Sequence, residues 1–148
     1  MYKPDICFYH YPCTDGIAAA ATVYKVYGPD VDYQRLQYGS LKPVLEYIEM
    51  CRDKHILMVD CSFTPDILDK VSQSALSIIM IDHHTGVYEN LKDYEVDKNT
   101  PLDQLSEDRK ISYIYDVTKS GASLTWSLLV DPNRTPLIIS YIEHNDLG

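Results

Sequence analysis

The sequence predicts an α/β fold: a mainly parallel five-stranded sheet, doubly wound, with helices on both faces. Short apolar runs typical of buried parallel strands alternate with segments whose apolar residues recur at helical spacing. Such alternation implies a parallel sheet with right-handed crossovers. The length of 148 residues suits one domain, so we expect a single domain over residues 1–148.

Five strands are expected, most of them from short runs of apolar residues. The run at residues 76–81 is apolar except for Ser77, as in a strand buried on both faces. If the strand order is 2-1-3-4-5, the switch point at which open α/β sheets bind ligands lies between the first and third strands. The strands are expected at residues 5–9, 31–38, 56–59, 76–81 and 111–115.

The helices between these strands begin or end at characteristic residues. Gly28 and Pro29 end the first helix, and Pro43 is tolerated in the first turn of the second. Thr64 is an expected N-cap, followed by Pro65 at the first helical position. Residues 95–110 are polar and charged, and we expect an exposed loop there. The helices are expected at residues 17–28, 41–51, 65–75, 87–94, 120–129 and 135–142.

Metal-competent side chains follow three of the expected strands. Each alone would more often be a helix cap or a turn residue. The carboxyl ends of adjacent parallel strands lie at one edge of a sheet, so together these side chains predict a site for one or two metal ions. They are His10, Cys13 and Asp15 behind the first strand, Asp60 behind the third, and Asp82, His83 and His84 behind the fourth.

The order and spacing of these motifs resemble a known family. Residues 10–16 are HYPCTDG, residues 59–63 are VDCSF and residues 81–84 are IDHH. Together they resemble the DHH phosphoesterases, which include RecJ-like exonucleases, nano-RNases, cyclic-dinucleotide phosphodiesterases and family II pyrophosphatases. Ser120 and Gly121 resemble the helix start that follows in many members, and Asp146 falls where the fourth motif carries its Asp. The resemblance spans nearly the whole chain.

The resemblance implies a centre that holds two divalent ions. Mn²⁺ is expected, with Mg²⁺, Co²⁺ or Zn²⁺ as alternatives, because the ligands mix carboxylates and imidazoles. Asp60 is expected to bridge the two ions. Cys13 occupies the position where the family motif has its first Asp. As a ligand, its thiolate would favour zinc or iron. Alternatively, Cys13 is a buried thiol beside a site with fewer ligands. The other expected ligands are His10 on one ion, Asp15 and His83 on the other, and Asp146.

Four residues have expected roles in catalysis or substrate binding. His84 is expected to point away from His83 along extended backbone, where it would contact the phosphate or protonate the leaving oxygen. Asp82 either orients an imidazole or completes the ligand sphere. Ser120 and Gly121 either bind a phosphate at a helix N-terminus or only cap that helix.

The leading hypothesis is therefore a metal-dependent hydrolase that cleaves phosphodiester bonds of short oligonucleotides or small nucleotides, as a nuclease of this family would. The alternatives are a non-catalytic metal- or nucleotide-binding module descended from such an enzyme, and a pyrophosphatase-like phosphatase. The chain has 13 basic against 22 acidic residues and a net charge of −9, which disfavours long duplex DNA as a partner. A homodimer is left open.

The remaining expectations concern location and domain organisation. No apolar stretch approaches 18 residues, so no membrane contact is expected. The four cysteines lack CxxC spacing, and Cys7 and Cys51 lie in apolar patterns, so a reducing, cytoplasmic location is expected. Members of the family usually continue into a C-terminal substrate-binding domain, and we expect this domain to be absent from the chain.

Overall fold

A computed structural model describes residues 1–147 and contains a five-stranded parallel sheet with the order β2-β1-β3-β4-β5. The predicted fold class is confirmed, and the strand order is the one for which the switch point was expected between the first and third strands. The order reverses between β1 and β3, which places the switch point where the sequence predicted it. The strands are β1 (Ile6–His10), β2 (Asp32–Leu36), β3 (His55–Val59), β4 (Ser77–Asp82) and β5 (Ile111–Tyr115).

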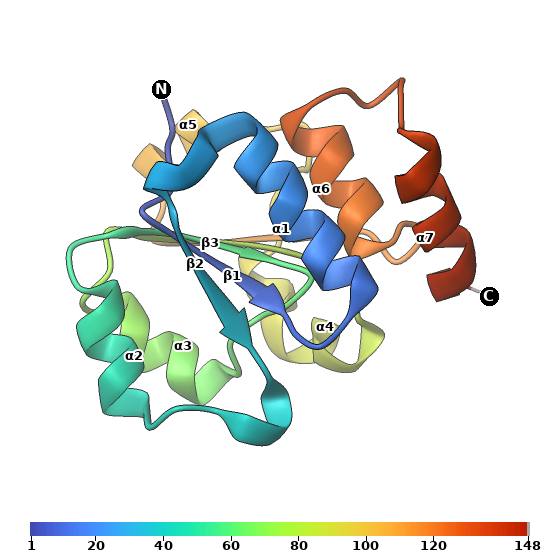
Figure 1. Ribbon diagram of the computed structural model, residues 1–148. Helices are drawn as coiled ribbons and strands as arrows, with labels where there is room; N and C mark the ends of the chain where they lie inside the picture. Colours follow the sequence, from blue (N-terminus) through green and yellow to red (C-terminus); the bar gives the residue numbers. More distant parts are fainter. Residues whose placement is uncertain (148) are drawn as a thin grey trace.

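Helices cover both faces of this sheet (Figure 1). One face carries α1 (Thr14–Tyr27), α5 (Leu102–Asp108) and α6 (Gly121–Leu129). On the outer side of that layer, α7 (Leu137–Leu147) packs beside α6 and α1. The opposite face carries α2 (Val44–Cys51), α3 (Pro65–Ser72) and α4 (Thr85–Leu91). Single 3-10 turns are η1 (Gly28–Asp30), η2 (Tyr38–Ser40) and η3 (Lys92–Tyr94).

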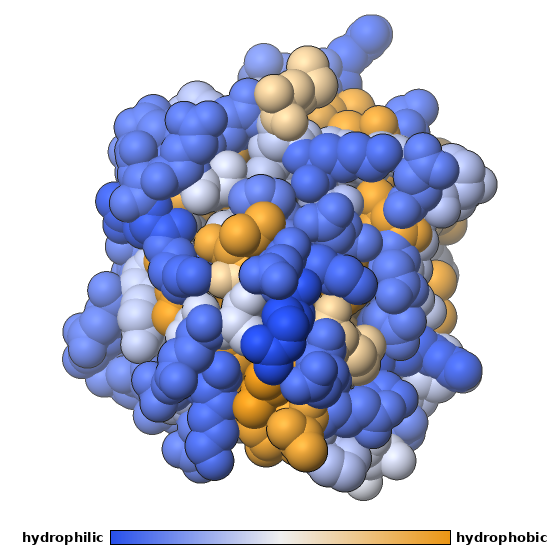
Figure 2. All heavy atoms as spheres, turned by 90° about the vertical axis from the view of Figure 1, so that its left-hand side faces the viewer, coloured by the Kyte–Doolittle hydropathy of each residue, from blue (hydrophilic) through white to orange (hydrophobic). Residues whose placement is uncertain are grey.

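The sheet separates two hydrophobic cores, because successive side chains of a strand point to opposite faces. In β3, Met58 packs toward α2, α3 and α4, whereas Leu57 and Val59 pack toward α1 and α6. All six residues of β4 are buried, as the apolar run predicted, but Leu76 at the start of that run precedes the strand and is 48% exposed. The face of the molecule shown in Figure 2 is mainly hydrophilic, with several separate apolar areas.

The expectation of an exposed loop at residues 95–110 is wrong for much of that segment. It contains α5, whose Leu105 is only 2% exposed and belongs to the core beneath α1. The backbone N–H of Val96 also donates to the carbonyl of Tyr113 at 3.0 Å, which attaches the segment to β5. The helix has seven residues and few apolar positions, so its periodicity is too short to detect in the sequence.

Strand pairing brings three site residues to one edge of the sheet. Tyr9 is paired with Val59, and Val59 with Ile81, so the residues that follow these three positions end their strands at the same level. Those residues are His10, Asp60 and Asp82.

Among residues 1–147, no helix is long and apolar enough to cross a membrane.

Candidate metal centre

Asp60 lies at the middle of this edge, directly after β3. Its backbone adopts a left-handed conformation with φ 59°, which Asp tolerates better than most residues, and its N–H donates to the carbonyl of Ile81 at 2.9 Å. The side chain is fully buried. One carboxylate oxygen, Oδ1, lies 2.9 Å from Nε2 of His83, and the other, Oδ2, lies 3.5 Å from Nδ1 of His10. Asp60 therefore stands between two imidazoles, one at the end of β1 and one directly after β4.

Two glycines of the sequence motifs allow this close packing. A Cβ atom at Gly121 would overlap the side chain of Asp60, and one at Gly16 would overlap the carbonyl of His10. Glycine is needed at both positions because the backbone of one element contacts a site residue of another. The sequence predicted Gly121 as a substrate-binding residue, and the structure adds a steric role for it.

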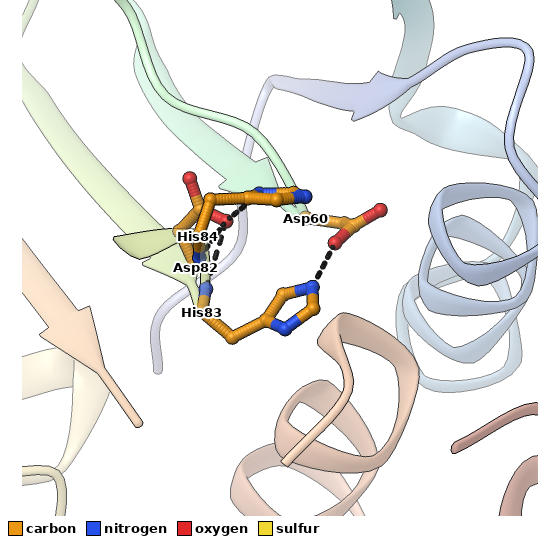
Figure 3. A group of neighbouring side chains, drawn as sticks. All are labelled: Asp60, Asp82, His83 and His84. Carbon is orange, nitrogen blue, oxygen red and sulfur yellow. Dashed lines mark hydrogen bonds and ion pairs between the residues drawn. The ribbon is translucent and has the colours of Figure 1, made fainter. Parts of the chain in front are cut away.

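His83 is nearly buried and faces three carboxylates. Its Nε2 atom lies 2.9 Å from Asp60, 3.2 Å from Asp15 and 3.8 Å from Asp146, and Figure 3 shows the imidazole pointing at Asp60. Burial opposes a charge on His83, but its hydrogen bonds and ion pairs with Asp15 and Asp60 raise its pKa to about 10. The carboxylates thus form a negative site that attracts positive charge.

Asp15 connects the metal-binding motif to the N-terminus of α6. Its carboxylate accepts hydrogen bonds from the N–H groups of Gly121 at 2.8 Å and Ala122 at 2.7 Å. Burial raises the pKa of Asp15, but the hydrogen bonds from His83, Ala122 and Gly121 outweigh it, so the pKa is lowered. This carboxylate satisfies two of the N–H groups that a helix start leaves unpaired.

The carboxylate of Glu143, on α7, also contacts the N-terminus of α6. This residue was not predicted from the sequence. Its carboxylate accepts a hydrogen bond from the N–H of Ser120 at 3.1 Å and another from the hydroxyl of Ser123. The hydroxyl of Ser120 accepts from the N–H of Ser123, so Ser120 is the N-cap of α6. The capping role of Ser120 is thus observed, whereas contact of Ser120 and Gly121 with a substrate stays a prediction.

A chain of hydrogen bonds fixes the orientation of His84. Asp82 is fully buried, and its Oδ1 atom lies 2.6 Å from Nδ1 of His84 while Oδ2 accepts from the hydroxyl of Ser62 at 2.8 Å. The Tyr38 hydroxyl in turn accepts from the N–H of Ser62 at 3.0 Å. Burial raises the pKa of Asp82, yet the hydrogen bonds from His84 and Ser62 lower it. Ser62 and Tyr38 had no recognisable signal in the sequence.

One expectation about His84 is wrong. Its ring does not point away from His83; the two ring centroids lie 4.4 Å apart, and Figure 3 shows both imidazoles on the same side of the chain. The alternation of side chains holds only within a strand, and β4 ends at Asp82. The side chain of His84 is nonetheless 40% exposed, so a ligand outside the protein can contact it.

The predicted site residues form three groups that suit metal ions, and two of these groups share no residue. In each group, donor atoms lie within 4.8 Å of one another. Nδ1 of His10 and Oδ2 of Asp60 are buried and have no hydrogen-bond partner among the described residues. A cation between them would satisfy both atoms, so the residues present fit a metal. The groups are His10, Cys13 and Asp60, and Asp15, His83 and Asp146; a third combines Asp60 with Asp82, His83 and His84.

A pocket of about 380 Å³ opens beside these groups, between the start of α1 and the end of α7. Its volume falls within the range of small-molecule sites. Asp146, whose side chain is 28% exposed, and Asp15 connect the pocket with the metal groups. Burial and the nearby charge of Asp15 raise the pKa of Asp146. The residues lining the pocket are Cys13, Thr14, Asp15, Tyr141, Ile142, Asn145 and Asp146.

Comparison with known proteins agrees with this geometry. Residues 6–144 match the model of the DHH family, N-terminal domain. An uncharacterized protein of Acanthamoeba polyphaga mimivirus is 24% identical over 157 aligned positions, which cover 97% of this chain and 33% of the viral protein. The chain thus spans about a third of the length of that relative. The family match includes the strand-end residues from His10 to His84, and we conclude that the chain belongs to the DHH family, whose members are generally phosphoesterases.

Proposed function

We propose that this protein is a divalent-metal-dependent phosphoesterase that hydrolyses phosphodiester bonds in short oligonucleotides or small nucleotides. The observation that carries the proposal is the position of Asp60, whose two carboxylate oxygens face two different groups of metal-competent atoms. A carboxylate that faces two ligand sets is the arrangement expected of a bridge between two ions. Membership of the DHH family supports the same chemistry.

The residues present would hold two divalent ions with distinct ligands. His10 and Cys13 would hold one ion, while Asp15, His83 and Asp146 would hold the other, and Asp60 would contact both. When bound, such ions stabilise negative charge on a phosphoryl group and lower the pKa of water. Both oxygens of Asp82 already accept hydrogen bonds, from Ser62 and from His84 and the N–H of His83. We therefore assign Asp82 to orientation of His84.

His84 is the residue that we assign to the substrate. Its Nδ1 atom is held by Asp82, which leaves Nε2 available on a half-exposed ring. From Nε2, a proton can be donated to the leaving oxygen of a phosphoester. Asp82, Ser62 and Tyr38 hold the ring in the orientation that this transfer requires.

The preference for a small substrate follows from charge and from the size of the pocket. The net charge of −9 opposes binding along a nucleic-acid duplex, which depends on many Lys and Arg contacts to phosphates. The pocket between α1 and α7 has about 380 Å³ and exposes the ring of Tyr141 beside Asn145. This volume suits one nucleoside, and a tyrosine ring can stack on its base.

The decisive experiment combines metal binding with hydrolysis. Calorimetric titration with Mn²⁺ should give two ions per chain, and Asp60→Asn, which keeps the size of the side chain, should lose this stoichiometry. The wild-type protein should then cleave a dinucleotide in the presence of Mn²⁺, and a chelator should stop the reaction. Metal binding without hydrolysis of any phosphoester would identify a non-catalytic module. Faster hydrolysis of pyrophosphate than of the dinucleotide would identify a pyrophosphatase-like enzyme.

A further inference from the structure

The two ligand groups differ in their donor chemistry. The group of His10, Cys13 and Asp60 offers a nitrogen, a sulfur and an oxygen, whereas the group of Asp15, His83 and Asp146 offers one nitrogen and two carboxylates. A thiolate is a soft ligand that selects zinc over manganese, while carboxylates suit manganese. The two halves of the centre are therefore unequal in the ions they favour.

The cysteine is placed as a ligand would be. Cys13 occupies the N-cap position of α1 with extended backbone. Its sulfur lies within 4.8 Å of the donor atoms of His10 and Asp60. Cys7, Cys51 and Cys61 are instead fully buried in or against the hydrophobic cores.

A second observation, independent of the cysteine, indicates that a cation binds between His10 and Asp60. The carboxylate of Asp60 is fully buried, yet its Oδ2 atom has no hydrogen-bond partner in the part of the chain that is described. Nδ1 of His10, 3.5 Å away, also lacks one. Leaving such atoms unpaired inside a protein costs free energy, and a cation between them and the thiolate removes this cost.

We propose that the centre is a mixed-metal site in which the group of His10, Cys13 and Asp60 binds Zn²⁺ and the group of Asp15, His83 and Asp146 binds Mn²⁺. This inference rests on the proposed two-metal centre and adds the assignment of a different ion to each half. Zn²⁺ binds most nitrogen and oxygen sites more tightly than Mn²⁺, but the thiolate makes this preference larger in the first group. Zinc is accordingly expected to fill that group first.

Cobalt provides a direct test, because Co²⁺ bound to a thiolate gives a charge-transfer absorption in the near ultraviolet. The first equivalent of Co²⁺ added to the metal-free protein should produce this absorption in full, and the second should bind without increasing it. Cys13→Asp should still bind two equivalents but show no such absorption. Cys51→Ala, a change at a buried cysteine outside both groups, should keep it.

Competition between the two ions supplies the second measurement. When Zn²⁺ is added to protein loaded with Mn²⁺, the first equivalent should release one Mn²⁺, detected by electron paramagnetic resonance of the free ion. Release of the second Mn²⁺ should need at least about tenfold more free Zn²⁺, and Cys13→Asp should reduce this difference. Circular dichroism would verify that the variant is folded, and Cys13→Ser serves as a second variant.

The outcomes separate this inference from the proposed function. Two bound cobalt ions without charge-transfer absorption would overturn the mixed-metal site and leave the two-metal centre intact. Absence of cobalt binding would overturn both. Simultaneous release of two Mn²⁺ ions at the same zinc concentration would also contradict the difference between the halves.

Discussion

The side chain of Asp60 packs directly against the backbone of Gly121, and a Cβ atom at residue 121 would overlap its carboxylate. These residues belong to different elements: Asp60 follows β3, and Gly121 begins α6. The glycine of the Ser-Gly-Ala segment is therefore a condition for the central carboxylate to occupy its position.

Gly121→Ala should displace Asp60 and weaken metal binding, because the added methyl group competes with the carboxylate for the same space. We expect the affinity for the first Mn²⁺ to fall at least about tenfold, which corresponds to about 1.4 kcal/mol. Calorimetric titration measures this change. Gly39→Ala is the matched control, because no atom lies within 4 Å of a Cβ at that position. Equal affinities in the two variants would contradict the steric role.

Asp15→Asn should destabilise the metal-free protein, because an amide oxygen cannot replace both carboxylate oxygens that accept from Gly121 and Ala122. Leaving one buried N–H unpaired costs about 1–3 kcal/mol. Urea unfolding in the presence of a chelator measures this loss. Asp146→Asn should change stability by no more than about 0.5 kcal/mol, because this carboxylate is partly exposed. A comparable loss in both variants would argue against the dual role of Asp15.

His84→Ala should reduce turnover without changing the number of bound ions, because we assign His84 to the substrate and His83 to a metal ion. The loss of a general acid lowers the rate by about 10²–10⁴-fold. The measurement is hydrolysis of a dinucleotide together with metal titration. His144→Ala, at an exposed histidine of α7, is the control and should behave as the wild type. Loss of a bound ion in His84→Ala would instead make this residue a ligand.

Asp116→Asn should lower stability near neutral pH and have no effect in acid. Burial raises the pKa of Asp116, but hydrogen bonds from Lys98 and Thr118 lower it below its ordinary value. Because the pKa is lower in the folded state, the ionised carboxylate stabilises the fold at any pH above its unfolded-state pKa of about 3.9. This stabilisation is lost as the pH falls through the pKa of the folded state. We expect a deficit of at most about 1 kcal/mol at about pH 7, because these contacts are exposed to solvent, and the deficit should close as the pH falls through the folded value; urea unfolding measures it. A deficit independent of pH would exclude the ionised carboxylate as its source.

Leu105→Ala should destabilise the protein by about 2–5 kcal/mol, because this residue of α5 is buried in the core on the face of the sheet where α5 packs on β4 and β5. Leu137→Ala, at a leucine of α7 that is 86% exposed, should change stability by no more than about 0.5 kcal/mol. Thermal or urea unfolding distinguishes the two. Equal, small effects would mean that α5 is a surface excursion, as the sequence suggested.

Much of the fold could be predicted because its evidence is local. Strands β3 and β4 are continuous apolar runs, and the helices between the strands carry recognisable first and last residues, as Thr64 and Pro65 do for α3. The alternation of these elements then implies a parallel sheet, whereas the strand order agrees with the family resemblance. The segment around α5 was missed because seven residues with one buried side chain contain too little periodicity.

The sequence by itself determined the α/β class and which residues end the strands at the site. Those properties depend on patterns within a few consecutive residues and on the geometry that all parallel sheets share. Only the tertiary structure decided how the site residues are held. The carboxylate of Asp15 receives the N–H groups of α6 from more than 100 positions away, and Asp82 is held by Ser62, 20 positions away. Such contacts depend on how the elements pack on one another, which no local pattern encodes.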